Sequence, residues 1–434
     1  MAITTTTQTM TVSPQNTEDF VTKEMKLLQQ PRKHSYLDDP ITLANWYKHV
    51  NWLHAVLLTS TPLIAIYGFF TTPLLLKTFI WSFIWYFCTG IGITAGYHRL
   101  WAHRAYTASL SLKLFLLACA SGAVEGSARW WCRDHRAHHR YTDTDRDPYN
   151  AHRGLLYSHV GWMYLKQNPQ RIGRSDISDL NADPLLSFQH RYYGLFALTF
   201  GVLFPMAVTG LGWGDWRGGF FFAAIARLVV VHHATFCVNS LAHYLGDTTY
   251  DDKHTPRDHF ITAILTMGEG YHNFHHEFPQ DYRNAIRFYQ YDPTKWLIKF
   301  CSWFGLSTHL KRFPDNEVAK GQLFMQQKKL DAKRRTLNWG VPLEKLPIFT
   351  FEEFQEISKT KNWVLIEGII HDVTNFIDEH PGGKAFITSS IGRDMTTAFN
   401  GGVYDHSNAA RNLTSMLRVG VIAGGGEVEH RKTK

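Results

Sequence analysis

Histidine is concentrated at three places in this 434-residue sequence, which holds 24 histidines in all. The clusters lie at residues 98–103, 135–139 and 272–276 and consist of His98, His103, His135, His138, His139, His272, His275 and His276. A single histidine is usually a structural residue. Neutral imidazole is also the commonest protein ligand of transition metals such as iron, copper, zinc and nickel. Eight histidines in three clusters therefore indicate a metal centre.

The spacing within the clusters sets geometric requirements. In the second and third clusters the histidines occupy positions i, i+3 and i+4, which share one face of a helix. His98 and His103 lie about 140° apart around a straight α-helix, so their rings can converge only where the helix ends or is distorted. Asn239 and His243, which are four residues apart, form a further pair on one face. Nine histidines exceed what one ion binds, so we expect two metals.

The type of metal centre follows from the other candidate ligands. Soluble di-iron bundles use glutamates and two Glu-x-x-His pairs. Glu269-x-x-His272 is a single such pair beside the clusters, so a centre built from histidine alone fits the sequence better. We expect the remaining histidines in the first domain to be structural or surface residues, including His152, His159, His232, His233, His254 and His259.

Four long uncharged segments must position these clusters. Runs of 28, 21, 23 and 19 residues without Asp, Glu, Lys or Arg lie between residues 48 and 77, 77 and 99, 191 and 215, and 227 and 247. A helix of about 20 residues crosses a bilayer core. We therefore predict membrane spans at about 50–70, 74–97, 192–212 and 220–240, in two helical hairpins. Buried core helices of a large soluble protein are the weaker alternative.

Charge and composition restrict the protein class further. With 44% hydrophobic and 19% charged residues, the chain is neither disordered nor fibrous. The net charge of +8 comes from basic residues that flank the apolar runs, which favours a cytosolic membrane surface or an anionic substrate over nucleic acid. Arg227 has no evident partner, and the sequence leaves its role open, with snorkelling as one interpretation. The five cysteines form no Cys-x-x-Cys pair, which indicates reduced thiols.

A second domain follows the last histidine cluster. We expect a disordered polar N-terminus without a cleaved signal peptide over residues 1–35, a membrane domain over 36–315 and a charged helical linker over 316–344. A small α+β domain is expected over residues 345–422, before a polar tail over 423–434. This domain contains His380 in His-Pro-Gly-Gly, with His406 following 26 residues later.

The motifs resemble those of a known family. The sequences at 96–103, 133–139, 239–243 and 268–276 are similar to those of membrane fatty acyl desaturases, specifically the acyl-CoA delta-9 (stearoyl-CoA) type, and the resemblance covers about residues 35–315. Residues 345–422 resemble cytochrome b5. Front-end desaturases carry the b5 part at the N-terminus and glutamine in place of His272. The C-terminal b5 part and His272 instead resemble the fungal delta-9 enzymes.

The resemblance implies a fold and a set of site residues. The expected fold is an all-α polytopic membrane domain, with four transmembrane helices and a cytosolic helical cap holding a di-iron site, followed by an α+β haem domain. Arg133 and Asp134 match positions that meet coenzyme A, and Trp131 matches an aromatic residue lining a bent acyl tunnel. His380 and His406 match the axial haem ligands. The iron ligands implied are His98, His103, His135, His138, His139, His243, His272, His275 and His276, with Asn239 binding through water; no other catalytic residue is implied.

The implied activity joins both domains. Removing hydrogen from an unactivated alkyl chain needs a metal and O₂, which acid–base side chains cannot replace. The resemblance implies a cis double bond between C9 and C10 of stearoyl-CoA or palmitoyl-CoA, with electrons from NADH-cytochrome b5 reductase relayed by the tethered haem. It also implies a multi-pass protein of the endoplasmic reticulum membrane with both termini in the cytosol. The alternatives are a di-iron fatty acyl hydroxylase on the same scaffold and a membrane-tethered b5 electron carrier, which would leave nine clustered histidines unexplained.

Overall fold

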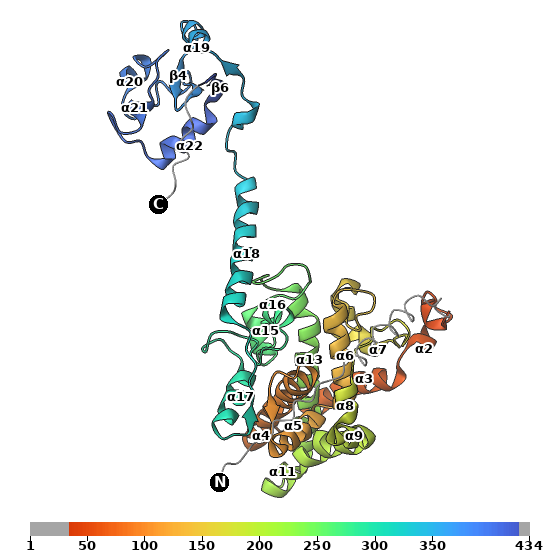
Figure 1. The fold of residues 1–434 in the computed structure, drawn as a ribbon. Helices are drawn as coiled ribbons and strands as arrows, with labels where there is room; N and C mark the ends of the chain where they lie inside the picture. Colours follow the sequence, from red (N-terminus) through yellow and green to blue (C-terminus); the bar gives the residue numbers. More distant parts are fainter. Residues whose placement is uncertain (1–33, 425–434) are drawn as a thin grey trace, which may run out of the picture. The chain divides into compact units, whose positions relative to one another are not determined.

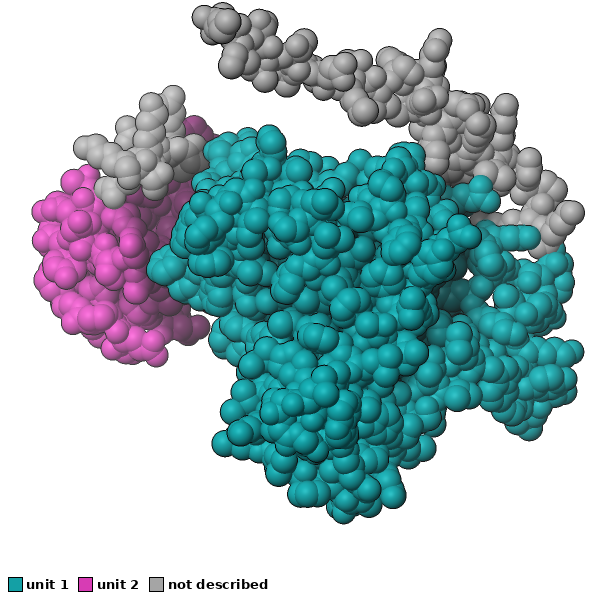
Figure 2. All heavy atoms as spheres, turned by 90° about the horizontal axis from the view of Figure 1, so that it is seen from below, with its two compact units in different colours: residues 1–325 teal, residues 326–434 magenta. Residues whose placement is uncertain are grey.

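The computed structural model describes residues 34–424 and divides the chain into two compact units, residues 1–325 and 326–434 (Figure 2). The predictions for the N-terminal segment and the C-terminal tail fall largely outside the described residues. The boundary between the units lies within α18 (Asp315–Arg335), a helix of 21 residues. This helix occupies most of the segment that the sequence predicts to be a helical linker.

Among its described residues, the first unit contains four helical segments that are each long and apolar enough to cross a membrane, which confirms the predicted number. They span Trp52–Thr71, Leu76–Ala102, Tyr193–Trp213 and Trp216–Tyr244 (Figure 1). The first is α3 (Trp52–Thr71), and the second is α4 (Leu76–Ile91) continued by the π-helix η2 (Gly92–Ala102). The third span consists of α10 (Tyr193–Leu198), η5 (Thr199–Leu203) and α11 (Phe204–Trp213). The fourth span consists of α12 (Trp216–Gly218), η6 (Gly219–Ala226), α13 (Arg227–Asn239) and α14 (Leu241–Tyr244).

The predicted hairpin turns have local causes. The third span ends at Gly214, whose φ of 77° is in the left-handed region that glycine adopts without steric cost. Asp215 then caps the next helix by accepting a hydrogen bond from the Gly218 N–H at 2.8 Å. In the first hairpin, α3 ends one residue before Thr72-Pro73, and the backbone at Thr72 is extended, as a residue before proline prefers.

The remaining helices of the first unit carry six of the nine clustered histidines, those at 135–139 and 272–276. Helices α5 (Leu110–Ala123) and α6 (Ala128–Tyr141) meet at a bend of 81°. Strands β1 (Thr107–Ala108) and β2 (Ser307–Thr308) form a small antiparallel pair, a minor departure from the all-α prediction. The other helices are η1 (Tyr36–Asp38), α2 (Trp46–His49), η3 (Ala151–Arg153), η4 (Tyr157–Gly161), α7 (Trp162–Tyr164), α8 (Ser178–Ala182), α9 (Pro184–Arg191), α15 (Phe260–Leu265), α16 (His272–Glu277) and α17 (Pro293–Trp303).

Arg227 does not snorkel, and the structure assigns this residue partners that the sequence did not reveal. Its side chain is buried, and the guanidinium donates to the carbonyls of Gly122 at 2.7 Å, Gly201 at 2.7 Å and Ala223 at 3.2 Å. The Gly122 carbonyl lies in the last turn of α5, where helical carbonyls lack a donor. The Gly201 carbonyl would receive a hydrogen bond from residue 205 in an α-helix, but Pro205 has no N–H. Arg227 therefore supplies donors that two other helices lack.

The second unit is a small α+β domain, as predicted. Its four-stranded sheet has the order β3-β6-β5-β4, in which β3 (Ile348–Phe349) is parallel to β6 (Arg418–Ile422) and the other pairs are antiparallel. Strands β4 (Trp363–Ile366) and β5 (Ile369–Asp372) form a hairpin that pairs Ile366 with Ile369. The helices are η7 (Leu343–Lys345), α19 (Phe351–Ile357), α20 (Lys384–Thr388), α21 (Thr396–Phe399) and α22 (Asn408–Met416).

Candidate functional site

The nine histidines singled out from the sequence come together in two groups, each of a size that one metal ion can bind. Within each group the available ligand nitrogens all lie within 4.8 Å of one another. The five-histidine group consists of His98, His103, His135, His139 and His275, and the four-histidine group consists of His138, His243, His272 and His276. The second and third sequence clusters are therefore each divided between the two groups.

A helix distortion brings His98 and His103 together, as their spacing predicts. The second span changes at Gly92 from α-helix to π-helix, and the His103 N–H donates to the His98 carbonyl at 3.0 Å. This bond joins residues five apart, as in a π-helix, and π-helical segments are frequent at functional sites. The two rings consequently lie 4.8 Å apart between centroids.

The ring nitrogens converge in a way that suits bound cations. The His275 Nε2 lies 2.8 Å from His98 Nε2 and 2.9 Å from His139 Nε2. In the other group, His276 Nε2 lies 3.1 Å from His272 Nε2 and 3.3 Å from His138 Nε2. Each neutral ring carries only one N–H, so three such nitrogens cannot all be satisfied by hydrogen bonds among themselves. A shared metal ion would satisfy them together.

Burial keeps these rings in the form that binds metals. Burial, together with the neighbouring His138, lowers the pKa of His272 to about 3. Burial, with nearby imidazoles, also lowers the pKa values of His275 and His276 well below the ordinary value. The buried His243 Nε2 has no hydrogen-bond partner among the described residues. Neutral rings with free nitrogen lone pairs are the ligands that a transition metal requires.

Carboxylates contact some of these rings at Nδ1, the nitrogen on the side away from the other histidines. Glu269 Oε2 lies 2.9 Å from His98 Nδ1, and Asp147 Oδ1 lies 2.8 Å from His138 Nδ1. The Thr255 hydroxyl lies 2.7 Å from His243 Nδ1 and donates to Asp143. Sequence reasoning considered Glu269 only as a possible ligand and missed Asp147, although an acid a few residues after a histidine cluster is a sequence signal that could have found it.

A cavity of about 1100 Å³ begins beside the five-histidine group. His98 and His135 line it, and the Trp131 indole stacks on the His135 ring with centroids 4.8 Å apart. Apolar residues such as Leu57 and Val231 form much of the remaining wall. A long apolar chain placed in this cavity would run beside the histidine nitrogens.

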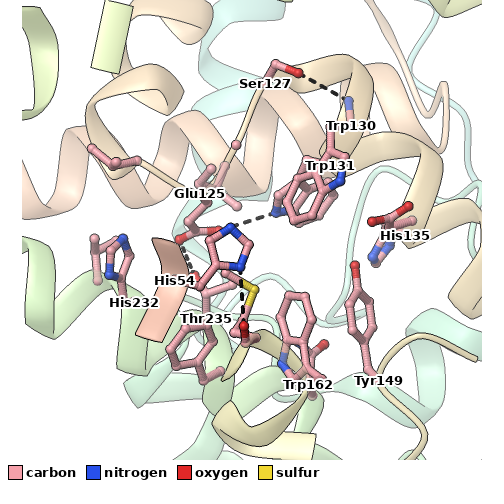
Figure 3. Close-up of a pocket in the computed structure, with 18 of the residues that line it drawn as sticks. His54, Glu125, Ser127, Trp130, Trp131, His135, Tyr149, Trp162, His232 and Thr235 are labelled. Carbon is pink, nitrogen blue, oxygen red and sulfur yellow. Dashed lines mark hydrogen bonds between the residues drawn. The ribbon is translucent and has the colours of Figure 1, made fainter. Parts of the chain in front are cut away.

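A polar group that the sequence reading missed also lines the cavity. The Glu125 carboxylate accepts a hydrogen bond from the Thr235 hydroxyl at 2.7 Å and one from the Trp131 indole at 3.3 Å (Figure 3). Val124, the preceding residue, has a φ of 57°, which is unusual for a β-branched residue. Glu125 could have been found as the one Asp or Glu between residues 40 and 133.

The predicted coenzyme A contacts and Asn239 line the same cavity. Arg133 Nε lies 2.6 Å from Asp134 Oδ1, and the Arg133 side chain is 45% exposed whereas Asp134 is buried. Asn239 is the last residue of α13. The histidines that we expected to be structural lie outside both metal groups; for example, His159 Nε2 lies 3.0 Å from His233 Nδ1.

In the second unit, His380 and His406 face each other with ring centroids 6.4 Å apart. The His380 Nδ1 donates to the Gly383 carbonyl at 3.2 Å, and the His406 Nδ1 donates to the Phe399 carbonyl at 3.0 Å. Both contacts leave Nε2 free to bind an iron. A Cβ at Gly382 would lie 2.9 Å from the His380 ring, which explains the need for glycine in this motif. The pair therefore fits a bis-histidine haem.

Comparisons with known proteins agree with this geometry. Residues 76–310 match the family described as Fatty acid desaturase, and residues 350–423 match Cytochrome b5-like Heme/Steroid binding domain. The chain is 58% identical over 392 residues to "Probable acyl-CoA desaturase" of Schizosaccharomyces pombe, covering 90% of this chain and 81% of that protein. It is 50% identical to "Acyl-CoA desaturase 1" of Saccharomyces cerevisiae, covering 89% and 76%. It is 38% identical to human "Stearoyl-CoA desaturase 5", covering 61% and 82%.

Proposed function

Because the chain belongs to the fatty acid desaturase family and carries a cytochrome b5-like domain, we propose that it is an acyl-CoA delta-9 desaturase with its own electron carrier. It is an oxidoreductase that acts on fatty acyl-CoA. The observation that carries the proposal is the position of two of the five histidines, His98 and His135, at the wall of a largely apolar cavity of about 1100 Å³. The position of the double bond, between C9 and C10, comes from the stearoyl-CoA desaturases to which the chain is similar.

Two irons are the proposed occupants of the histidine groups. The five-histidine group would hold one and the four-histidine group the other, and Asn239 would bind iron through a water. When bound, the irons would supply the O₂ chemistry that removes hydrogen from an unactivated alkyl chain. Imidazoles suit iron, and the absence of a carboxylate from both groups distinguishes this site from the soluble glutamate-bridged bundles.

The cavity residues would position the substrate. An acyl chain in the cavity would contact Trp131, and the charged pair of Arg133 and Asp134 on the same cavity wall would meet the coenzyme A portion. An arginine recognises phosphate through several N–H donors. The distance along the cavity between this charged pair and the histidines would then determine which carbon atoms react.

Electrons would arrive through the second unit. Bound between His380 and His406, haem would accept and pass on single electrons. We propose NADH-cytochrome b5 reductase as the donor. Tethering the carrier to the membrane unit raises its local concentration without a further binding interface.

The described residues include four helices able to span a membrane, and the chain is a multi-pass membrane protein. We propose that it resides in the endoplasmic reticulum with both termini in the cytosol, where positively charged segments next to the spans are favoured. The basic residues near the histidine clusters support this orientation.

Expression in a host that lacks delta-9 desaturase tests the proposal. We expect C16 and C18 fatty acids with a cis double bond at C9, and none in the His139→Ala variant. Products heavier by one oxygen would instead identify a hydroxylase. No modified fatty acid, with haem and iron both bound, would reject desaturation and leave a tethered electron carrier.

A further inference from the structure

The two histidine groups are supported by separate buried carboxylates. The His98 ring belongs to the five-histidine group, and its Nδ1 lies 2.9 Å from Glu269. The His138 ring belongs to the four-histidine group, and its Nδ1 lies 2.8 Å from Asp147. Both carboxylates are almost completely buried. Each group thus contains one ring that contacts an acid directly.

These contacts determine which nitrogen of each ring is free. A carboxylate accepts only, so Nδ1 must carry the hydrogen and Nε2 must present its lone pair. The His98 Nε2 then faces His275 Nε2 at 2.8 Å, and the His138 Nε2 faces His276 Nε2 at 3.3 Å. In both groups the nitrogen left free is therefore the one that points toward the other ligands.

The two carboxylates are themselves held by different partners. Glu269 accepts from Arg99 at 2.8 Å and from Asn284, and Arg99 also pairs with Asp292 at 3.0 Å. Burial would raise the pKa of Glu269, but Arg99 and His98 outweigh it and lower the pKa to about 2.

Asp147 is held by backbone groups. It accepts from the N–H groups of Asp143 at 3.1 Å and Tyr149 at 2.9 Å. Among the described residues, no lysine or arginine forms an ion pair with Asp147. The two supports therefore share no residue.

We propose that Glu269 and Asp147 are positioning residues that fix His98 and His138 for metal binding, each in one group only. This inference depends on the proposed function in one respect: it assumes that each of the two histidine groups binds an iron. Carboxylates that orient a metal-binding histidine typically change metal affinity by about 10–100-fold. Because the two carboxylates share no partner, replacing one of them should lower the iron affinity of its own histidine group and leave that of the other group unchanged.

Amide variants test this with little change in shape. In Glu269→Gln and Asp147→Asn, the new NH₂ group cannot accept, so each variant loses a hydrogen bond that the carboxylate makes. Asp292→Asn is the matched control, because Asp292 shares Arg99 but contacts none of the nine histidines. Asparagine can still cap α17 at that position.

The full-length protein in detergent is dialysed against increasing concentrations of an iron chelator, with haem absorbance as the internal reference. We expect Glu269→Gln and Asp147→Asn each to release one iron of two at a chelator concentration about 10–100-fold lower than the wild type. The double variant should release both irons early, and Asp292→Asn should match the wild type.

Two iron-release results would overturn the proposal. One is release of both irons together, at the wild-type concentration, from each single variant. The other is early release from Asp292→Asn, which would assign the effect to the Arg99 ion pairs. Thermal unfolding of the metal-free proteins provides a second readout: a positioning role predicts similar melting temperatures, whereas a large drop in the metal-free state would indicate a merely structural role. Iron release does not depend on the product formed, so a failed desaturation assay would leave this result interpretable.

Discussion

Arg227→Met should destabilise the membrane unit, because Arg227 is the donor for backbone carbonyls on two other helical segments. The guanidinium donates to Gly122 at the end of α5 and to Gly201 in the third span, both at 2.7 Å. Methionine fills similar space but donates no hydrogen bond. The variant would therefore leave two buried carbonyls without a donor.

The size of the effect follows from these two carbonyls. A buried polar group left unsatisfied costs about 1–3 kcal/mol, so the pair should lower the free energy of unfolding by about 2–6 kcal/mol. For a unit of this size, about 2 °C per kcal/mol converts this to a fall of about 4–12 °C in melting temperature. The bond to Ala223 adds little, because it lies within the same helix four residues away.

Thermal unfolding in detergent, followed by the loss of soluble monomer, measures this change. Arg227→Lys should have an intermediate effect, because one ammonium group replaces three guanidinium donors. Arg217→Met is the matched control on the same span. Its side chain is exposed and contacts Thr72 and Thr71, so we expect a change within about 0.5 kcal/mol.

An Arg227→Met protein that melts at the wild-type temperature would refute this reasoning. It would mean that the two helix ends find other donors, or that relief from burying a charge offsets the lost hydrogen bonds. A fall in melting temperature no larger than that of Arg217→Met would lead to the same conclusion.

Four further outcomes follow from the geometry. His139→Ala should lose iron and turnover but keep the haem spectrum; two irons per chain in that variant would remove His139 from the ligands. His380→Ala should lose haem absorbance and turnover while iron stays bound, and full turnover without added b5 would reject the relay. Thr235→Val should cost about 1–3 kcal/mol in thermal unfolding, and adding Glu125→Leu should recover most of it, whereas simple additivity would contradict their coupling. The metal-free protein should lose stability as the pH falls from about 6.5 toward 3, because the unfolded chain then protonates the three histidines of α16 while the folded chain does not. Carboxyl groups whose pKa burial raises, such as Asp258 at about 6, act in the opposite direction, so a melting temperature that rises on acidification would contradict the assignment.

Much of the fold was predictable because its causes are local. Uncharged runs long enough to cross a bilayer predicted four spans, and the structure has four such helices. The turns between them follow from Pro73 and Gly214. The spacing of His98 and His103 required a distorted helix, and η2 is a π-helix.

The sequence by itself determined the chemistry available: clustered imidazoles for metals, a His-Pro-Gly-Gly turn for haem and apolar runs for a membrane. These depend on residue type and on spacing along one helix. Only the tertiary structure decided how the clusters are divided, since His138 and His139 are neighbours yet belong to different groups. It also decided the partners of Arg227, Glu125 and Asp147. Adjacent residues on a helix diverge by about 100°, so their partners depend on which distant helices pack on each side.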